Sequence, residues 1–273
     1  MAPLTGAALA RAIKDHVEGK HLDSGKALEE WVARTPDGIC MMVQKYGQNW
    51  KKQFQEYIDN YALQIRMWQA TCTYAERINA EYREGMSTEQ GRNWIYKWLE
   101  KQQIDKYVWI NAVETVMNKT HPKKNTLVMV GISNSCKSLM SKIITAPYTT
   151  GLVVKQGLSS SPFNWQNLRY KNLAVVEEPL ITPTEVETYK LLMGGERLEV
   201  QVKGQDMWEL DRTPMVMTAN GVLSKWVNAV DLQAMINRTF YFECNYEMEP
   251  DCQITEQDWY AVYRELSCER NAE

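Results

Sequence analysis

The sequence predicts an α/β fold with a mostly parallel central sheet, preceded by a helical module. Apolar residues recur at helical spacing through the first third, whereas short apolar runs of strand length alternate with helical segments further on. A Ser/Asn-rich motif, GISNSCKS at 131–138, lies between the first such run and a helical segment. We therefore expect two domains: residues 1–120, a helical module suited to oligomerisation, and residues 121–273, the α/β domain.

Composition, charge and cysteine spacing argue against several classes of function. The 273 residues are 44% hydrophobic and 24% charged, with a net charge of -3. No apolar run approaches the ~20 residues of a membrane span, and the first residues lack the pattern of a signal peptide. Proteins that coat nucleic acid are usually basic, so we expect any such contact to be local. The six cysteines form no CxxC pair, which predicts reduced thiols and no zinc site.

An apolar stripe predicts one long helix between Gly47 and Gly85. Its members recur at spacings of four and three, with no Pro or Gly between them: Trp50, Phe54, Tyr57, Tyr61, Ile65, Trp68, Cys72 and Ala75. Such a stripe favours a core or a subunit interface over a ligand site. Ser87 then begins a capping box that predicts a second helix, and Asp105 is the expected cap of a third.

Four apolar runs predict the strands of the sheet. They are LVMV (127–130), LAVVEE (173–178), TPMVMTAN (213–220) and FYFEC (240–244). The segments RLEVQV and MWEL flank a KGQD turn, which indicates a β-hairpin. Thr182 begins another capping box, and the helix after it should end at Gly194–Gly195. TEQDWYAVYREL closes the chain as an amphipathic helix.

The motif at 131–138 matches the P-loop pattern G-x-x-x-x-G-K-[ST] except at Cys136, where the pattern has Gly. In a P-loop, backbone N–H groups and a helix N-terminus surround phosphates. Lys137 would neutralise the β- and γ-phosphates, and Ser138 would ligate Mg²⁺. The predicted ATP-binding residues are Gly131, Asn134, Ser135, Cys136, Lys137 and Ser138. The alternative is a Ser/Asn-rich turn that caps a helix.

Polar residues at two later strand ends complete a catalytic set. Glu177 and Glu178 end an apolar strand, where adjacent acids are costly to bury without a partner. Glu177 would hold Mg²⁺, usually through water, and Glu178 would activate the attacking water. Asn220 would position that water, and Arg238 would reach a neighbouring subunit's γ-phosphate as an arginine finger. The alternatives are a strand end entering solvent for the acids, a turn residue for Asn220 and a surface residue for Arg238.

The order of these motifs resembles the superfamily 3 helicase domain of the parvovirus replication proteins. The resemblance covers roughly residues 91–243. It includes GRNWIYKWLE, KKNTLVMVG before the P-loop, SPFNWQNLRYKNLAVVEE through the acids, and LLMGGERLEVQVKGQ before TPMVMTAN. Members are AAA+ ring motors that unwind DNA in the 3′-to-5′ direction. The resemblance implies an AAA+ fold, the Walker A, Walker B, sensor 1 and arginine-finger roles for the residues above, and ATP and Mg²⁺ as cofactors.

The resemblance also implies how the chain meets DNA. Lys203 matches the lysine at the tip of the pore hairpin, and Gln205 stands where many members have a second basic residue. A solvated turn lysine is the alternative for Lys203. The implied assembly is a homo-oligomer, a hexameric ring around single-stranded DNA, in the host cell nucleus and away from membranes. The family's origin-binding nuclease domain has no counterpart in this sequence.

The residue at position 136 separates the functional hypotheses. The first is an ATP-driven DNA helicase motor of viral replication. The second is a nucleotide-binding but non-hydrolysing assembly or packaging subunit, in which Cys136 disables turnover. The third is an ordinary α/β core with a false P-loop.

Cys136 places a Cβ where the P-loop pattern has its last glycine. A residue with a Cβ adopts a positive φ only at a cost, but a helical φ would accommodate it. A thiol beside Lys137 at a helix N-terminus should also have a lowered pKa.

Overall fold

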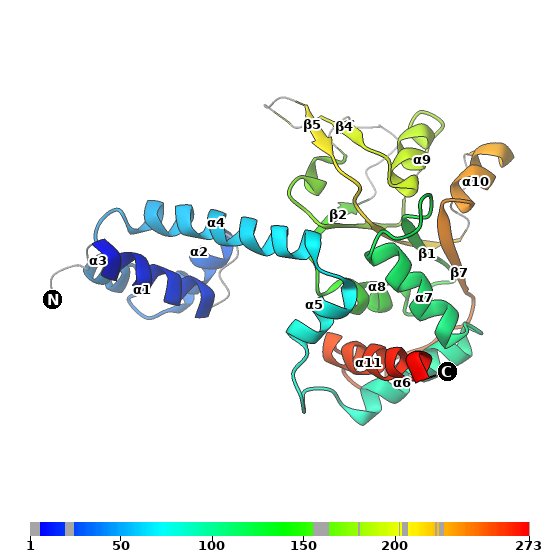
Figure 1. Cartoon of the computed structure of the whole chain (residues 1–273), viewed down its shortest axis with the longest axis horizontal. Helices are drawn as coiled ribbons and strands as arrows, with labels where there is room; N and C mark the ends of the chain where they lie inside the picture. The colour runs from blue at the N-terminus through cyan, green and yellow to red at the C-terminus, as the bar shows by residue number, and fades with distance from the viewer. Residues whose placement is uncertain are drawn as a thin grey trace. The chain divides into compact units, whose positions relative to one another are not determined.

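The computed structural model describes residues 6–19, 25–154, 164–179, 181–201, 203, 207–221, 223 and 227–272 (Figure 1). The chain divides into two compact units, Met1–Ala70 and Thr71–Glu273. The helices between residue 71 and the expected domain boundary near 120 therefore belong to the second compact unit. The role of the first residues in oligomerisation stays a prediction.

The second unit is built on a five-stranded parallel sheet in the described part of the chain. The strands are β1 (Thr126–Gly131), β2 (Thr150–Val154), β3 (Leu173–Glu177), β6 (Met215–Asn220) and β7 (Thr239–Cys244). Their order is β2-β3-β6-β1-β7. The predicted parallel α/β sheet is confirmed. The sequence reading missed β2, an edge strand in which Leu152 is 45% exposed, because its apolar run is short.

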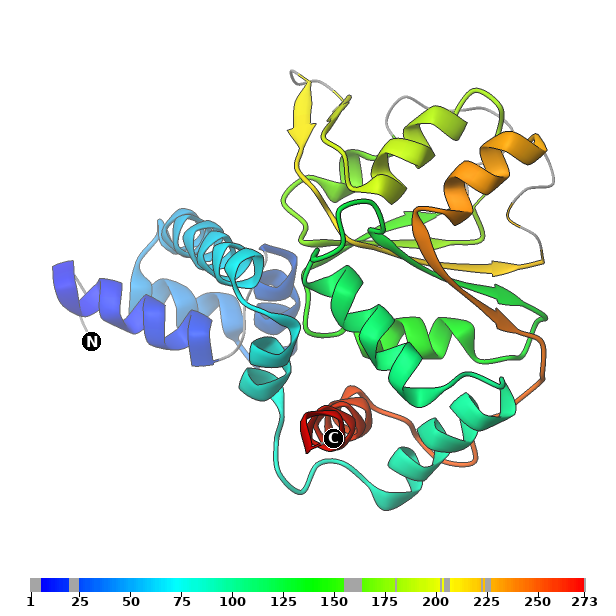
Figure 2. The same ribbon diagram turned by 45° about the vertical axis from the view of Figure 1, so that its right-hand side comes forward.

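Helices cover both faces of this sheet, which explains why its strands read as continuous apolar runs. Side chains of β1 alternate between two cores: Leu127 and Met129 enter one, and Val128 and Val130 enter the other. The first core includes residues of α6 (Glu89–Lys101), α7 (Lys106–Met117), α8 (Lys137–Thr145) and α11 (Glu256–Ala272). The second includes residues of α9 (Val186–Gly194) and α10 (Ala229–Ile236). Figure 2 shows α9 and α10 on one side of the sheet and α7 and α8 on the other.

Helix caps place the ends of these helices. Asp105 caps α7 as predicted, accepting the N–H groups of Tyr107 and Val108 at 2.9 Å. The predicted cap of α6 is wrong by one residue, because the hydroxyl of Thr88, and not of Ser87, accepts the N–H of Gly91 at 2.9 Å.

The start of α9 also differs from the prediction. The helix begins at Val186, and the carbonyl of Thr182 accepts the N–H groups of Glu185 and Val186 in a turn before it. The predicted capping box therefore folds as a separate turn. Gly195, with φ 74°, ends the helix as predicted, since glycine adopts this left-handed conformation at low cost.

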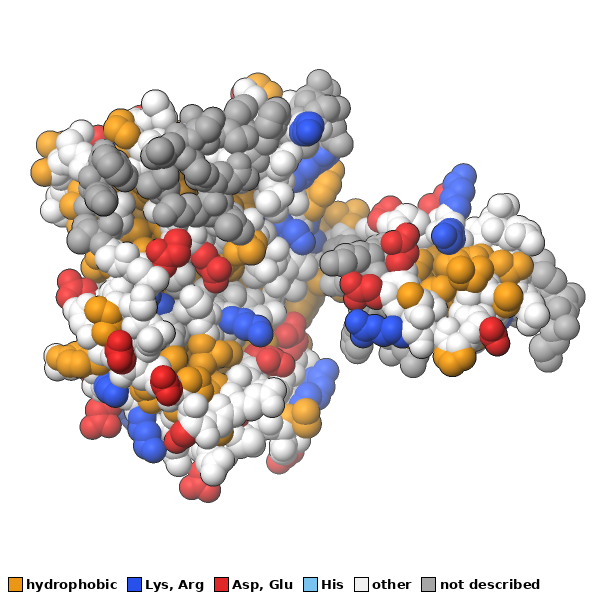
Figure 3. Space-filling model, turned by 180° about the vertical axis from the view of Figure 1, so that it is seen from behind, with side chains coloured by type: hydrophobic (Ala, Val, Ile, Leu, Met, Phe, Trp, Pro, Cys, Tyr) orange, Lys and Arg blue, Asp and Glu red, His pale blue; other side chains and the backbone are white. Residues whose placement is uncertain are grey.

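Charges of both signs are mixed on one face of the molecule, as the near-neutral composition suggests. Figure 3 shows acidic and basic side chains interspersed on the face in view. Within the described ranges, no helix is both long enough and apolar enough to cross a membrane.

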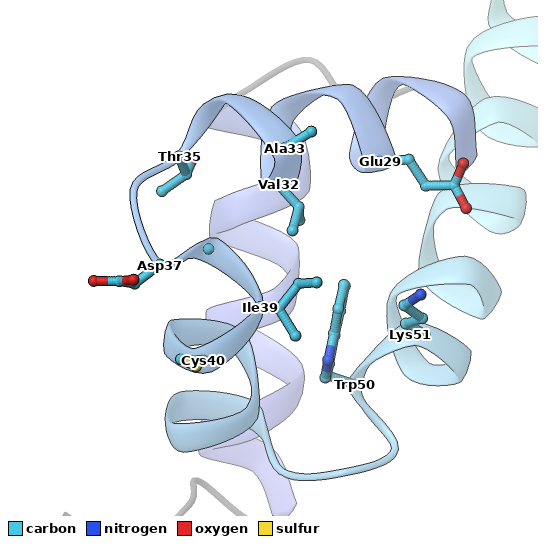
Figure 4. A pocket seen from close by; sticks show the side chains of 10 residues that line it. Glu29, Val32, Ala33, Thr35, Asp37, Ile39, Cys40, Trp50 and Lys51 are labelled. Atoms are coloured by element: carbon cyan, nitrogen blue, oxygen red, sulfur yellow. The ribbon is translucent and has the colours of Figure 1, made fainter.

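The first unit contains α1 (Gly6–Gly19), α2 (Gly25–Arg34), α3 (Gly38–Tyr46) and nearly all of α4 (Trp50–Thr71). Trp50 and Phe54 of the predicted stripe are buried in its core. A cavity of about 420 Å³ lies between α2, α3 and the start of α4, where Val32, Ile39 and Trp50 line it (Figure 4).

The predicted long helix is interrupted. It ends at Thr71, and α5 (Tyr74–Glu81) begins after a new cap at Thr73. The Thr73 hydroxyl accepts the Glu76 N–H at 3.2 Å, and the Glu76 carboxylate accepts the Thr73 N–H at 2.7 Å. This capping box competes with a continuous helix, because it satisfies the N–H groups that a helix break exposes.

Candidate functional site

The predicted site residues meet at the carboxyl edge of the sheet. Gly131 at the end of β1 pairs with Asn220 of β6 and with Cys244 of β7. Glu177 at the end of β3 pairs with Thr218 of β6. Because these strands are parallel, their carboxyl ends lie along one edge, where α/β proteins commonly bind ligands. The P-loop, both acids and Asn220 are therefore brought together.

Lys137 opens α8, and its ammonium group points back into the loop. It donates to the Ile132 carbonyl, to Ser135 Oγ at 2.8 Å and to Asn220 Oδ1 at 3.1 Å. Only 5% of Lys137 is exposed. Burial lowers the pKa of Lys137, and the nearby Glu178 acts in the opposite direction. A cation held by neutral oxygens in a recessed loop is well placed to bind an anionic phosphate.

Residues distant in sequence hold the loop in shape. Trp98 of α6 donates its indole N–H to the Ser135 carbonyl at 2.8 Å. The Met248 N–H, in the segment after β7, donates to the Asn134 carbonyl at 2.8 Å. Sequence reasoning missed Trp98 and Met248, and their apolar character signalled only core packing. Gly131 is also restricted, because a Cβ there would lie 2.0 Å from the Cys244 carbonyl oxygen.

Cys136 has a left-handed backbone, with φ 60° and ψ 21°. The expectation that a helical φ accommodates this side chain is wrong. The conformation is the one that favours glycine, and for other residues it costs about 1–2 kcal/mol. The thiol compensates in part, because it donates to the Met248 carbonyl at 2.8 Å.

The expected lowering of the Cys136 pKa is also wrong. Burial raises the pKa of this thiol, the nearby Glu249 raises it further, and Lys137 acts in the opposite direction. The thiol sits half-buried against the Met248 carbonyl, so desolvation of the thiolate outweighs the attraction of Lys137. Cys136 is therefore a neutral hydrogen-bond donor at neutral pH.

The Glu178 carboxylate is hydrogen-bonded to the backbone of Asn220 rather than to a basic side chain. Its carboxylate accepts the backbone N–H of Asn220 at 3.0 and 3.1 Å, and its own N–H donates to the Thr218 carbonyl at 2.9 Å. Its φ of 47° is unusual for a residue with a side chain, and such strain is typical of functional sites. Asn220 thus connects Glu178, through its backbone, to Lys137, through its side chain.

Ser138 and Glu177 line one cavity of about 440 Å³, with Thr150, Leu152 and Val175 among its other walls. A hydroxyl and a carboxylate are the oxygen ligands that Mg²⁺ prefers, and Mg²⁺ at phosphate sites keeps several waters and one or two protein ligands. The oxygen atoms of Ser138 and Glu177 therefore have the chemistry to hold a Mg²⁺ ion, and Lys142 adds a positive charge to the same wall. A second cavity of about 470 Å³ lies beyond Gly131 and Asn220, with Tyr241 and Asn245 in its wall.

Arg238 lies at the opposite edge of the sheet. It precedes Thr239, which pairs with Thr126 at the start of β1. Its guanidinium donates to the Ala234 carbonyl at 2.7 Å. The structure does not bring Arg238 together with Lys137 in one chain, and its role toward a neighbouring subunit stays a prediction.

The hairpin expected to meet DNA is present. β4 (Leu198–Val200) and β5 (Trp208–Leu210) pair antiparallel. Lys203 is exposed in the connection between them, and its backbone N–H donates to Gln166 Oε1 at 3.4 Å. Gln205 lies outside the described residues.

The five-stranded parallel sheet and the loop between β1 and α8 define an α/β domain of the P-loop type. The chain belongs to the family described as Parvovirus non-structural protein NS1, whose model matches residues 26–264. It is 23% identical over 241 residues to the initiator protein NS1 of Aedes albopictus densovirus, covering 84% of this chain and 30% of that protein. It is 23% identical over 206 residues to initiator protein NS1 of porcine parvovirus, covering 73% of this chain and 29% of that one.

Solved structures share the fold. An X-ray structure of JCV helicase with an inhibitor bound matches 98% of this chain and 83% of that one, with a TM-score of 0.58 and 13% identity. Another X-ray structure of JCV helicase gives a TM-score of 0.52 at 16% identity, with 80% of this chain and 67% of that chain covered. The solved structures therefore share the predicted α/β fold with its parallel sheet. The chain spans less than a third of the length of the NS1 relatives named above.

Proposed function

We propose that this chain is the ATP-driven DNA helicase motor of a viral replication protein. The observation that carries the proposal is the connection Lys137–Asn220–Glu178, which joins a phosphate-binding cation to a candidate catalytic acid through one residue. Membership of the NS1 family supports it, as do relatives named initiator proteins and a shared fold with a protein named a helicase.

The residues divide the chemistry of ATP hydrolysis among them. Lys137 and the loop's N–H groups bind the β- and γ-phosphates. Mg²⁺, held by Ser138 and Glu177, supplies charge neutralisation when bound. The Glu178 carboxylate has lone pairs beyond those that accept the Asn220 N–H, and these orient the attacking water and accept its proton. The Asn220 side chain holds Lys137 before nucleotide arrives and faces the γ-phosphate afterwards.

The proposed assembly places one site at each subunit interface. Arg238 lies at the sheet edge away from Lys137. An arginine that acts on a neighbouring subunit's phosphate needs such a position, away from the phosphate site of its own chain. Six subunits form a ring, residues 1–120 contribute to its assembly, and Lys203 of each hairpin contacts single-stranded DNA in the pore. Unwinding runs in the 3′-to-5′ direction in the host nucleus. Such local contact agrees with a net charge of -3.

Steady-state ATP hydrolysis with Mg²⁺, with and without single-stranded DNA, tests the proposal. We expect DNA-stimulated turnover in the parent and its loss in Lys137→Ala and in Glu178→Gln. Turnover that survives both substitutions would contradict the assigned site.

The second candidate function is a nucleotide-stabilised assembly or packaging subunit. The left-handed backbone at Cys136 favours it, because a side chain at this position crowds the phosphates and disturbs the geometry that hydrolysis requires, while the rest of the loop still binds nucleotide. Tight ATP binding without hydrolysis, with turnover restored in Cys136→Gly, would support this alternative. Measurable turnover in the parent, equal to that of Cys136→Gly, would exclude it.

A further inference from the structure

A cluster of aromatic and basic side chains lies beside the β4–β5 hairpin, away from the ATP site. It consists of Arg169 and Tyr170, which follow the short helix η1 (Gln166–Leu168), and of Trp208 at the start of β5. The rings of Tyr170 and Trp208 meet edge to face, with centroids 4.9 Å apart. The Arg169 guanidinium lies 4.6 Å from the Tyr170 ring centroid and 4.7 Å from that of Trp208. We call these three residues the Tyr170 cluster.

Tyr170 is exposed although the backbone around it is well held. Half of its surface (50%) is exposed, and its φ is 62°. An aromatic residue in the left-handed region is unusual, and such strain concentrates at functional sites. The neighbouring turn is anchored by the fully buried Leu168 and by Asn167, whose side-chain amide donates to the Leu152 carbonyl at 3.3 Å. The ring is thus held next to an anchored turn, with half of its surface open to solvent.

The Tyr170 cluster adjoins the residue expected to contact DNA phosphates. Trp208 pairs with Val200 in the hairpin, and the Lys203 N–H donates to Gln166 on the turn that precedes Arg169. Lys171, which follows Tyr170, is exposed and adds a third basic side chain. The acidic Glu209 lies next to Trp208, on the opposite face of the hairpin, where it pairs with Arg197 at 3.1 Å.

We propose that the Tyr170 cluster is a stacking platform for the bases of single-stranded DNA. The inference rests on the proposed DNA motor and adds a base-contacting surface to it. An exposed ring flanked by basic residues stacks on bases of any sequence, while the basic groups neutralise phosphates. A duplex keeps its bases paired and stacked, so the platform favours a single strand.

Fluorescence anisotropy of the full chain, with Mg²⁺ and a non-hydrolysable ATP analogue, tests this proposal. The probes are an oligo-dT and an abasic oligonucleotide of the same length, which keeps the phosphates but lacks bases. We expect Tyr170→Leu to weaken oligo-dT binding about tenfold and to leave abasic binding unchanged. Tyr170→Phe should bind oligo-dT as the parent does. Tyr246→Leu, the same exchange at another exposed tyrosine, is the matched control and should not alter the preference for bases.

The outcomes separate this inference from the proposed function. Lys203→Ala should weaken the binding of both probes, because it removes a phosphate contact. If Lys203→Ala weakens binding and Tyr170→Leu matches the parent on both probes, the platform is wrong and the motor stands. If the parent binds neither probe, both proposals fail. If Tyr170→Leu loses its native circular dichroism spectrum, the variant is unfolded and its binding cannot be interpreted. Photocrosslinking of the parent to a 5-iododeoxyuridine oligonucleotide then tests the platform instead. Crosslinks at Tyr170 or Trp208 support the platform, and crosslinks found exclusively elsewhere overturn it.

Discussion

The ammonium of Lys137 donates to the side-chain oxygen of Asn220 across 3.1 Å, although 83 residues separate the two in sequence. The same asparagine holds the Glu178 carboxylate with its backbone N–H. One residue at the end of β6 therefore contacts both the proposed phosphate-binding lysine and the proposed catalytic base.

Replacement of Asn220 should separate these two tasks. Asn220→Ala removes the oxygen that faces Lys137 and keeps the backbone N–H that holds Glu178. We expect kcat for ATP hydrolysis to fall by about 10²-fold, as for loss of one positioned polar group in an active site, with a smaller change in nucleotide affinity. Steady-state kinetics and titration with a fluorescent ATP analogue measure the two effects. Asn237→Ala, at the end of α10, is the control and should retain kcat.

The backbone at Cys136 predicts an order of stabilities. Cys136→Ala keeps the strain at positive φ and loses the hydrogen bond to the Met248 carbonyl. Cys136→Gly loses the same bond but relieves the strain. We expect the alanine variant to be less stable than the glycine variant by about 1 kcal/mol in urea unfolding. An alanine variant that is as stable as the glycine variant would show that the loop relaxes to another conformation.

The raised pKa of Cys136 predicts slow alkylation at neutral pH. The thiolate is the reactive species, and burial keeps the Cys136 thiol protonated. Iodoacetamide at pH 7.5 should modify the exposed Cys40 and Cys268 before Cys136, as peptide mass spectrometry would show. The folded state holds this proton more tightly than the unfolded chain, so its contribution to stability falls as pH rises past the ordinary thiol pKa. Fastest labelling at Cys136 would contradict this assignment.

The indole of Trp98 predicts a link between α6 and nucleotide binding. Trp98→Phe keeps an aromatic ring in the core but leaves the buried Ser135 carbonyl without its N–H donor. We expect a loss of about 1–3 kcal/mol in unfolding free energy and a severalfold weaker affinity for ATP. Trp94→Phe is a close control, because its indole donates at 3.1 Å to the Glu249 carbonyl, outside the loop. It should lose stability and keep its affinity, so equal losses of affinity in both variants would contradict a specific role for Trp98.

Much of the second unit could be predicted because its signals are local. Four strands were recognisable in the sequence as apolar runs. The P-loop, the two acids and Asn220 lie at the ends of three of them. In a parallel sheet with both faces covered, the central strands are buried on both faces, so their apolar runs are recognisable without knowledge of partners. The P-loop followed its strand and opened its helix as expected. By contrast, β2 was missed because its apolar run, Leu152 to Val154, is three residues long.

The sequence by itself determined the parallel α/β class, the P-loop lysine and serine, the paired acids and Asn220, because each depends on residues adjacent along the chain. The tertiary structure alone decided the left-handed backbone at Cys136, the direction of its pKa shift and the Trp98 and Met248 contacts that shape the loop. The break at Thr73, by contrast, rests on a local signal, the capping box of Thr73 and Glu76, which the prediction of one uninterrupted helix overlooked. Backbone conformation and thiol desolvation at position 136 are set by segments more than a hundred residues away, such as the one carrying Met248, and no local pattern encodes such neighbours.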